Sequence, residues 1–364
     1  METKIVRITD AAAQQAELAA AGRILREGGL VAFPTETVYG LGANGLDAKA
    51  SAGIYEAKGR PSDNPLILHV DGRAMIDTIA AEVPDMAEKL MAAFWPGPMT
   101  LILKKKPVVP ARITGGLDTV GIRMPEDDTA RALIRAAGVP VAAPSANISG
   151  RPSPTTAQGV YADMKGRIPL ILDGGACIFG VESTIIDCSG GVATILRPGA
   201  ITREMVEELL GAVQLDPALV GADTVPRAPG MKYTHYAPKA PLTLLEGKAS
   251  SMLSAFQQEL ARLQREGHTV GIIASHEVII GLSGRLEPDM VYDYGPQGNL
   301  RAIAASLYEA LRSFDHCPAD MLLAEGVTEE GLGLAIMNRL HKASGFRTIF
   351  IDSVGINVQN KKKK

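Results

Sequence analysis

The chain has few cysteines, no long apolar run and almost no net charge, and each of these shortages excludes a class of protein. Its three cysteines, Cys177, Cys188 and Cys317, are widely separated and show no C-x-x-C spacing, so we expect reduced thiols rather than a zinc or redox site. No run reaches the roughly 18 apolar residues of a membrane span, and the N-terminus has no apolar signal-peptide core, so we expect a cytoplasmic protein without a membrane partner. A net charge of −3 argues against a wholly basic nucleic-acid binder.

Three common signatures of catalysis or nucleotide binding are also missing. The chain has no G-x-x-x-x-G-K-[ST] loop, so an ATP site would have to hold phosphates with side chains and a metal ion. Ser145 lies in Pro-Ser-Ala-Asn rather than in a G-x-S-x-G elbow, which argues against a Ser-His-Asp hydrolase. Residues 40–45 fit the dinucleotide fingerprint, with Asp63 about twenty residues on, but Asp63 precedes the next strand-like run instead of closing it. That order argues against an NAD site.

The length and the patterning predict two domains. With 364 residues, 46% of them apolar and 21% charged, the chain is too long for one ordinary core. Short strand-like runs in residues 1–210 predict an α+β or mixed-sheet domain, whereas residues 211–241 are rich in glycine and proline and are interpreted as a linker. Strand and helix patterns alternate over residues 242–357, which predicts a smaller parallel α/β domain. Residues 358–364, with lysine at 361–364, are interpreted as a solvated basic tail, with RNA contact as the alternative.

The periodicity also predicts individual elements. Helices are expected over residues 11–25, 48–58, 83–94, 127–137, 200–210, 250–265, 300–314 and 332–343. Strands are expected over residues 29–33, 66–70, 100–103, 120–124, 170–173, 242–245, 270–274, 290–294 and 321–324.

Three loops rich in hydroxyl groups adjoin strand-like runs of the first domain. They are residues 33–42 (FPTETVYGLG), 145–150 (SANISG) and 180–187 (GVESTIID). Buried hydroxyl and carboxylate groups need hydrogen-bond partners, so such a density is unfavourable in an apolar core. We therefore expect ligand-facing loops that share one concave site, and well-bonded turns remain the alternative.

Four cations and one histidine accompany these loops. Lys58, Arg60, Arg123 and Arg197 lie in or beside them, and guanidinium groups suit phosphate or carboxylate. Each cation taken singly is interpreted as a surface charge, so the hypothesis depends on their shared placement at strand and helix ends. His69 lies in an apolar strand and is either a hydrogen-bonded core residue or part of the site.

The predicted linker contains aromatic and basic side chains that are unusual for a passive tether. Residues 229–238 read PGMKYTHYAP, which places Lys232, Tyr233, His235 and Tyr236 within five residues. Two interpretations stay open. Either residues 226–238 close over the cavity of the first domain, or the aromatic side chains simply join the two domains.

Seven ordered motifs resemble the YrdC/Sua5 family of threonylcarbamoyl-AMP synthases. They are residues 33–42, Lys58-Gly-Arg60, Asn64-Pro-Leu, Trp95-Pro-Gly-Pro-Met-Thr100, Ser145-Ala-Asn147, Glu182-Ser-Thr-Ile-Ile-Asp187 and Arg197-Pro-Gly. The match spans residues 5–210, and residues 229–238 with the α/β tail resemble the long, two-domain Sua5 form. One departure is Ala228, where the family often has serine, and we expect little consequence from it.

The resemblance implies a twisted mixed sheet with a basic concavity, followed by a Rossmann-like domain. It implies a nucleotidyltransferase that makes L-threonylcarbamoyladenylate and pyrophosphate from L-threonine, bicarbonate or CO2, and ATP. The product feeds N6-threonylcarbamoyladenosine formation at position 37 of tRNAs that read ANN codons, so the expected partners are ATP, threonine, bicarbonate and the downstream tRNA threonylcarbamoyl-transfer machinery. The alternatives are a non-catalytic RNA-binding protein and a carbamoyl-transfer maturation factor, whose usual zinc-finger and acylphosphatase-like companions are missing here.

The resemblance also assigns roles to individual residues. Threonine binding is expected at Thr35, His69, Arg123, Ala143 and Ser183. ATP binding is expected at Lys58, Arg60, Asn64, Thr119, Ser145, Ser153, Arg197 and Tyr236. The catalytic group is expected to be Lys58, Arg60, Ser145 and Asn147, with Lys58 and Arg60 neutralising the pyrophosphate leaving group. Mg²⁺ is expected to bridge the ATP phosphates without a protein ligand, because no carboxylate cage is visible.

Overall fold

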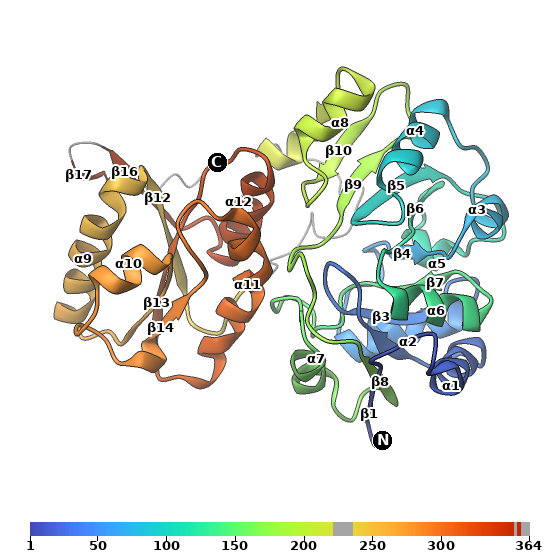
Figure 1. Ribbon diagram of the computed structural model, residues 1–364, viewed down its shortest axis with the longest axis horizontal. Helices are drawn as coiled ribbons and strands as arrows, with labels where there is room; N and C mark the ends of the chain where they lie inside the picture. The colour runs from blue at the N-terminus through green and yellow to red at the C-terminus, as the bar shows by residue number, and fades with distance from the viewer. Residues whose placement is uncertain (221–235, 353–354, 358–364) are drawn as a thin grey trace. The chain divides into compact units, whose positions relative to one another are not determined.

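The structure is a computed structural model that describes residues 1–220, 236–352 and 355–357, and these form two compact units (Figure 1). The described residues of the first unit are 1–149 and 153–220, and those of the second unit are 150–152, 236–352 and 355–357. The first unit contains a mixed sheet and the second a parallel α/β sheet, so the predicted fold class is confirmed.

The sheet of the first unit has eleven strands in the order β1-β8-β2-β3-β7-β4-β6-β5-β9-β10-β11. The strands are β1 (Lys4–Arg7), β2 (Val31–Phe33), β3 (Gly40–Asn44), β4 (Ile67–His69), β5 (Met99–Lys104), β6 (Thr119–Arg123), β7 (Val141–Ala142), β8 (Leu170–Asp173), β9 (Thr184–Asp187), β10 (Thr194–Arg197) and β11 (Gln214–Leu215). The helices are α1 (Gln15–Arg26), α2 (Ala48–Lys58), α3 (Arg73–Ile79), α4 (Asp85–Phe94), α5 (Ala111–Thr114), α6 (Asp128–Ala137), α7 (Ala157–Met164) and α8 (Arg203–Leu210), with a short 3-10 helix η1 (Pro217–Val220).

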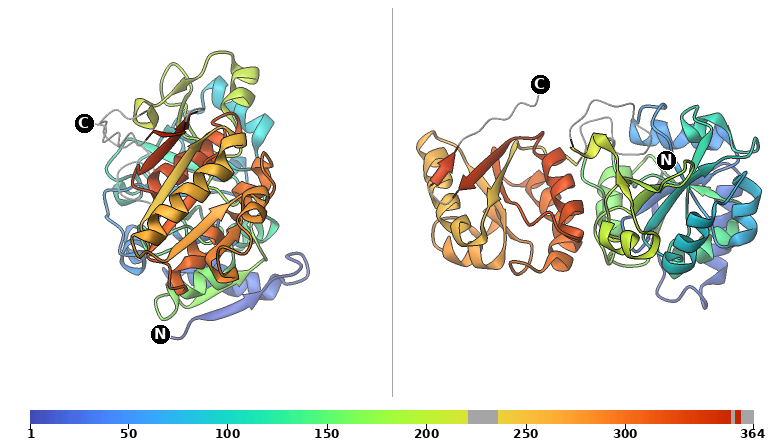
Figure 2. Two further views of the ribbon diagram at one scale, coloured as in Figure 1. Left: turned by 90° about the vertical axis from the view of Figure 1, so that its left-hand side faces the viewer. Right: turned by 90° about the horizontal axis from the view of Figure 1, so that it is seen from above.

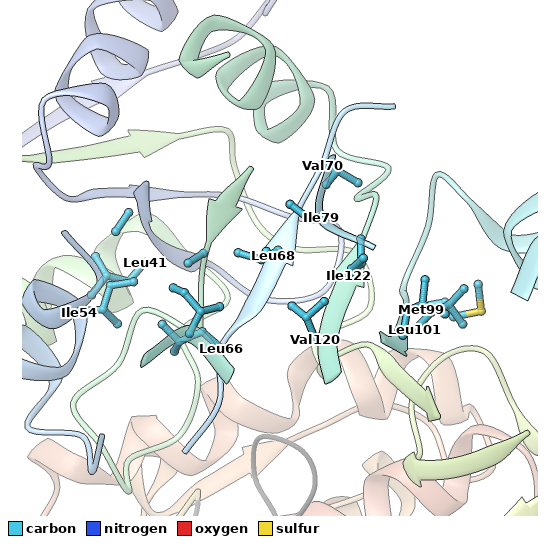
Figure 3. Close-up of a cluster of buried hydrophobic side chains, with 14 of the residues drawn as sticks. Leu41, Ile54, Leu66, Leu68, Val70, Ile79, Met99, Leu101, Val120 and Ile122 are labelled. Atoms are coloured by element: carbon cyan, nitrogen blue, oxygen red, sulfur yellow. The ribbon is translucent and has the colours of Figure 1, made fainter. Parts of the chain in front are cut away.

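Strands β4, β6 and β5 are neighbours in this sheet, with an apolar face on one side and a mixed face on the other, where Ile67 and Ile102 join a small apolar cluster. Successive side chains of a strand point to opposite faces. One face carries the main apolar core, including Leu66, Leu68, Val70, Leu101, Val120 and Ile122 (Figure 3). The alternate positions on the other face are Ile67, His69, Thr100, Ile102, Thr119 and Arg123. We call this second surface of β4, β6 and β5 the polar face.

The predicted loop over residues 33–42 is only partly a loop, because strand β3 begins at Gly40. Residues 34–39 connect β2 to β3, and β3 pairs antiparallel with β2. The glycines explain the close pairing: a methyl group added at Gly42 would lie 2.9 Å from the Phe33 ring and from Val141 Cγ1. The sequence prediction missed β3 because glycine has low β-propensity and gives no apolar alternation.

Helices α1 and α6 pack against each other, and Gly22 lies where α1 meets the backbone of α6. A methyl group added at Gly22 would lie 2.6 Å from the carbonyl carbon of Ala136. We therefore expect Gly22→Ala to lower the free energy of unfolding by about 1–3 kcal/mol through overpacking.

Gly53→Ala in helix α2 is the matched control, because the atoms nearest to its added methyl group would be side-chain atoms of Leu30, at least 3.6 Å away. Alanine has the higher helix propensity by about 1 kcal/mol, so this variant should be as stable as the parent or more stable. Urea unfolding of the full chain measures both variants. An equal loss of stability in the two would contradict the close packing of α1 on α6.

The second unit has a sheet in the order β14-β13-β15-β12-β16-β17, in which the first five strands are parallel and β17 is antiparallel to β16. The strands are β12 (Leu242–Gly247), β13 (Val270–Ala274), β14 (Val291–Asp293), β15 (Met321–Glu325), β16 (Thr348–Asp352) and β17 (Gly355–Asn357). The helices are α9 (Ala249–Arg265), α10 (His276–Gly281), α11 (Leu300–Ser313) and α12 (Leu332–Ala343), with 3-10 helices η2 (Pro288–Met290) and η3 (Phe314–His316). Helices α9 and α10 contact each other, as do α11 and α12, and the two pairs cover opposite faces of the sheet (Figure 2).

The regular pattern of residues 242–357 predicted most of these elements. The predicted strand 270–274 and helix 332–343 coincide with β13 and α12. Helix α10, which has only six residues, and strand β16 were not predicted. No helix within the described ranges is long and apolar enough to cross a membrane.

Candidate active site

A buried ion pair between Arg123 and Glu36 lies at the end of the polar face. Arg123 ends strand β6, and its Nη2 donates a hydrogen bond to Glu36 Oε1 at 2.7 Å. The two side chains are 5% and 1% exposed. Buried charges are stable only when paired and hydrogen-bonded. The pair therefore joins the loop of residues 34–39 to the sheet.

His69 lies beside Arg123, since the parallel register of β4 and β6 pairs the two residues. Its ring packs edge-on against Phe33, with the ring centroids 6.0 Å apart. Burial, reinforced by the Arg123 charge, lowers the pKa of His69 to about 3, so the imidazole is neutral at neutral pH. Its Nδ1 has no hydrogen-bond partner among the described residues. The histidine is thus buried in the core, and the strand register places it next to the Arg123–Glu36 ion pair.

Hydroxyl groups surround the same end of the polar face. Thr35 Oγ1 donates to the Val38 carbonyl at 2.7 Å and lies 2.9 Å from Thr37 Oγ1, so it shapes the loop that presents Glu36. On the other side, Ser183 Oγ lies 2.8 Å from Thr100 Oγ1 and accepts a hydrogen bond from Arg197 Nη2 at 3.1 Å. Strand pairing between β5 and β9 brings residues distant in sequence to one place.

Ala143 completes the set of residues predicted to bind threonine. It follows β7, and its backbone N–H donates to the Ile67 carbonyl at 2.9 Å, at the start of β4. The five predicted residues thus lie in the 34–39 loop and in or next to strands β4, β6, β7 and β9. In the sheet these strands follow the order β7-β4-β6-β5-β9, so β5 is the one strand that separates them.

Lys58 ends helix α2 and is 1% exposed. Its Nζ donates to the carbonyl oxygens of Ser145 at 2.5 Å and Asn147 at 2.6 Å, and lies 3.4 Å from Asn147 Oδ1. Burial, followed by the charge of Arg60, holds the pKa of Lys58 well below its usual value, while Asp163 opposes the shift. The lysine therefore anchors the second hydroxyl-rich loop, in which Ser145 Oγ donates to Asn147 Oδ1 at 2.5 Å.

The remaining residues predicted to bind ATP are spread more widely. Ser153 is buried and donates through Oγ to Glu182 Oε1 at 2.7 Å. Arg60 Nη2 donates to the Pro65 carbonyl at 3.2 Å, and Asn64 is buried nearby. Thr119 begins strand β6 and therefore lies at the opposite end of that strand from Arg123.

Tyr236 belongs to the second unit, where its ring centroid lies 5.2 Å from that of Tyr308. Lys232, Tyr233 and His235 lie outside the described residues, as do residues 358–364 of the predicted tail.

Several polar residues of this region were not assigned roles from the sequence. Glu36 pairs with Arg123, Thr100 contacts Ser183, and Asp163 accepts the Ile148 N–H at 3.1 Å in the loop that Lys58 anchors. Glu36 and Thr100 lie inside two of the seven family motifs, so the sequence could have pointed to both residues. Asp163 lies in helix α7, which was not predicted. Among the described residues no group of three or more His, Cys, Asp and Glu side chains could hold a metal ion.

Known protein families match most of the chain. Residues 23–199 match the Sua5_yciO_yrdC family, described as Telomere recombination, and residues 201–345 match the Sua5_C family, described as the threonylcarbamoyl-AMP synthase C-terminal domain. The chain is 49% identical to the threonylcarbamoyl-AMP synthase of Pyrococcus abyssi over 331 residues, 90% of this chain and 94% of the relative. It is 47% identical to the threonylcarbamoyl-AMP synthase of Bacillus subtilis over 353 residues, 96% of this chain and 100% of the relative.

A solved structure is similar over the same extent. The crystal structure of P. abyssi Sua5 complexed with L-threonine matches with a TM-score of 0.90 and 46% identity, covering 97% of this chain and 100% of that chain. The resemblance drawn from the seven motifs is confirmed. The chain therefore belongs to the two-domain Sua5 family of threonylcarbamoyl-AMP synthases, and it is an enzyme.

Proposed function

We propose that the polar face of the first unit, with the loops around residues 36 and 145, carries out the threonylcarbamoyl-AMP synthase reaction. The enzyme joins L-threonine, bicarbonate or CO2, and ATP to give L-threonylcarbamoyladenylate and pyrophosphate, which serves N6-threonylcarbamoyladenosine formation in tRNA. The observation that carries this placement is the buried Arg123, whose Nε has no hydrogen-bond partner among the described residues. A buried guanidinium with a free donor suits the carboxylate of an amino acid.

Threonine is proposed to lie against Arg123, with Thr35, His69 and Ser183 around its amine and hydroxyl and the Ala143 backbone nearby. The relative that was crystallised with L-threonine supports an amino-acid site in this fold. The neutral His69 ring can accept or donate a hydrogen bond without adding a charge.

ATP is proposed to extend from this site toward the loop of Ser145 and Asn147. The Nζ of Lys58 already donates to this loop, so we propose that Lys58 shapes it and that Arg60 supplies more of the charge for the pyrophosphate leaving group. The proposed ATP contacts also include Asn64, Thr119, Ser145, Ser153 and Arg197. Mg²⁺ is proposed to arrive with the ATP phosphates and to offset their negative charge, since the described residues offer no carboxylate cage.

The protein's own part in the chemistry is positioning and desolvation. Threonine's amine, once it has lost its ammonium proton, attacks CO2 with release of a second proton, or bicarbonate with loss of water. The resulting carbamate then attacks the α-phosphate and displaces pyrophosphate. Apart from the partly exposed Thr119, the side chains of the polar face are buried, so water is scarce where the hydrolytically fragile adenylate is proposed to form. We further propose that residues 1–210 form the catalytic domain. The enzyme is proposed to be cytoplasmic and to have the downstream tRNA threonylcarbamoyl-transfer machinery as its partner.

Pyrophosphate release tests this proposal. With ATP present, release should require both threonine and bicarbonate, because the carbamate must form before the α-phosphate is attacked. Omission of either substrate should reduce release to the background of a reaction without enzyme. Equal release without threonine would contradict the proposal, and tight tRNA binding with no calorimetric signal for threonine or ATP would favour the RNA-binding alternative.

A further inference from the structure

Glu36 is paired with Arg123 in the proposed threonine site and has one bonded and one unbonded carboxylate oxygen. Oε1 accepts the hydrogen bond from Arg123 Nη2, whereas Oε2 is buried and has no hydrogen-bond partner in the described part of the chain. An unsatisfied buried polar atom costs about 1–3 kcal/mol, and more when the group is charged. A ligand that supplies the missing partner is one explanation for such an atom.

Two side chains near Glu36 also have a buried polar atom without a hydrogen-bond partner. Arg123 Nε and His69 Nδ1 are also buried without partners in the described ranges. His69 and Arg123 are paired by strand register, and Arg123 is bonded to Glu36, so the three atoms belong to one place. A ligand here would meet the N–H donor of the Arg123 cation, the acceptor oxygen of the Glu36 anion and a nitrogen of the neutral His69 ring.

The charges of this place match a zwitterion rather than a simple anion. Arg123 and Glu36 already neutralise each other, so a ligand that brought only a carboxylate would leave one uncompensated buried negative charge. A ligand with a carboxylate and an ammonium group adds no net charge. Its carboxylate would complete the donors of Arg123, and its ammonium group would complete Glu36 Oε2.

We propose that Glu36 Oε2 receives the ammonium group of threonine and thereby restricts the site to α-amino acids with a free amino group. This inference rests on the proposed function. Glu36 acts here as a binding residue for the substrate as well as the partner that orients Arg123.

Glu36→Gln separates the two roles. Glutamine keeps the size of the side chain and an oxygen for Arg123 Nη2, but it loses the negative charge that attracts an ammonium group. The two probes are L-threonine and its 2-hydroxy analogue, in which a hydroxyl replaces the ammonium group. By calorimetry, the variant should bind threonine at least about 30-fold more weakly, while its affinity for the analogue should not fall, because the analogue's carboxylate no longer adds a second negative charge beside Arg123.

A parallel loss of affinity for both probes would overturn the inference, because it would show that Glu36 only orients Arg123. Unchanged threonine affinity would overturn it as well. Glu36→Asp, which keeps the charge, should retain more threonine affinity than the glutamine variant. Glu259→Gln in α9, which removes another buried carboxylate charge paired with arginine, should leave the affinity for both probes unchanged.

The parent protein gives an independent readout if the glutamine variant does not fold. It should bind threonine at least about 30-fold more tightly than the analogue, and equal affinities would overturn the inference. A parent protein that binds threonine and releases pyrophosphate but fails these tests rejects the role of Glu36 alone. A parent that binds no threonine rejects the proposed function.

Discussion

Arg123→Ala should abolish detectable threonine binding and, with it, adenylate formation. Arg123 is the cation of the polar face whose Nε is free for a carboxylate, and it is buried where water cannot replace it. Loss of one partner of a buried, hydrogen-bonded charge pair weakens binding by about 2–5 kcal/mol, which corresponds to at least about 30-fold. Calorimetric titration of the full chain with threonine measures the loss.

The same variant should also be less stable, because it leaves Glu36 as an unpaired buried charge. Breaking such a pair typically costs about 3–5 kcal/mol in the free energy of unfolding. The double variant Arg123→Ala with Glu36→Gln removes the stranded charge and should recover part of the stability without recovering threonine binding. If the double variant bound threonine like the parent protein, Arg123 would have no place in the site.

Lys58→Met should reduce adenylate formation by at least about 100-fold while it changes threonine affinity by less than about threefold. Methionine is similar in length but donates no hydrogen bond, so the carbonyl groups of Ser145 and Asn147 lose their donor. An unsatisfied buried carbonyl costs about 1–3 kcal/mol, so the loop that is proposed to hold ATP should change conformation. Turnover and threonine calorimetry on the same sample separate the two effects.

Lys49→Met is the matched control for this prediction. Lys49 lies in the same helix, α2, but it is exposed and at the opposite end from Lys58. Its replacement should leave turnover and threonine affinity unchanged. A similar fall in turnover in both variants, or a loss of threonine affinity in Lys58→Met that equals its loss of turnover, would show a general defect of the helix instead of a role for the loop.

The sequence predicted long amphipathic helices and apolar strands well, and it predicted short or glycine-rich elements poorly. Helix α2 was predicted with its observed bounds; in the structure Asp47 caps its N-terminus and Gly59, at φ 61°, ends it. Strand β3 was hidden inside the predicted loop, since its glycines give no alternation of apolar and polar residues. Helix α7 was missed as well, and with it the placement of Asp163.

For the site, the motifs indicated which residues to consider but not which of them meet. Residues 36, 69 and 123 come together only through the pairing of β4 with β6 and through one ion pair. Neither the register of two strands nor the partner of a buried arginine can be read from the spacing of residues. Glu36 was visible inside the first motif, yet its role depends on an unbonded oxygen that only the three-dimensional structure shows.

The most direct measurement of the central claim follows isotopically labelled bicarbonate into the product. The parent protein and Arg123→Ala are incubated side by side with ATP, threonine and labelled bicarbonate, and threonylcarbamoyladenylate is measured by mass spectrometry. If the polar face holds the reaction, the labelled adenylate forms only when all three substrates are present, and it disappears in Arg123→Ala. Labelled adenylate at the parental rate in Arg123→Ala would contradict the assignment of the reaction to the polar face.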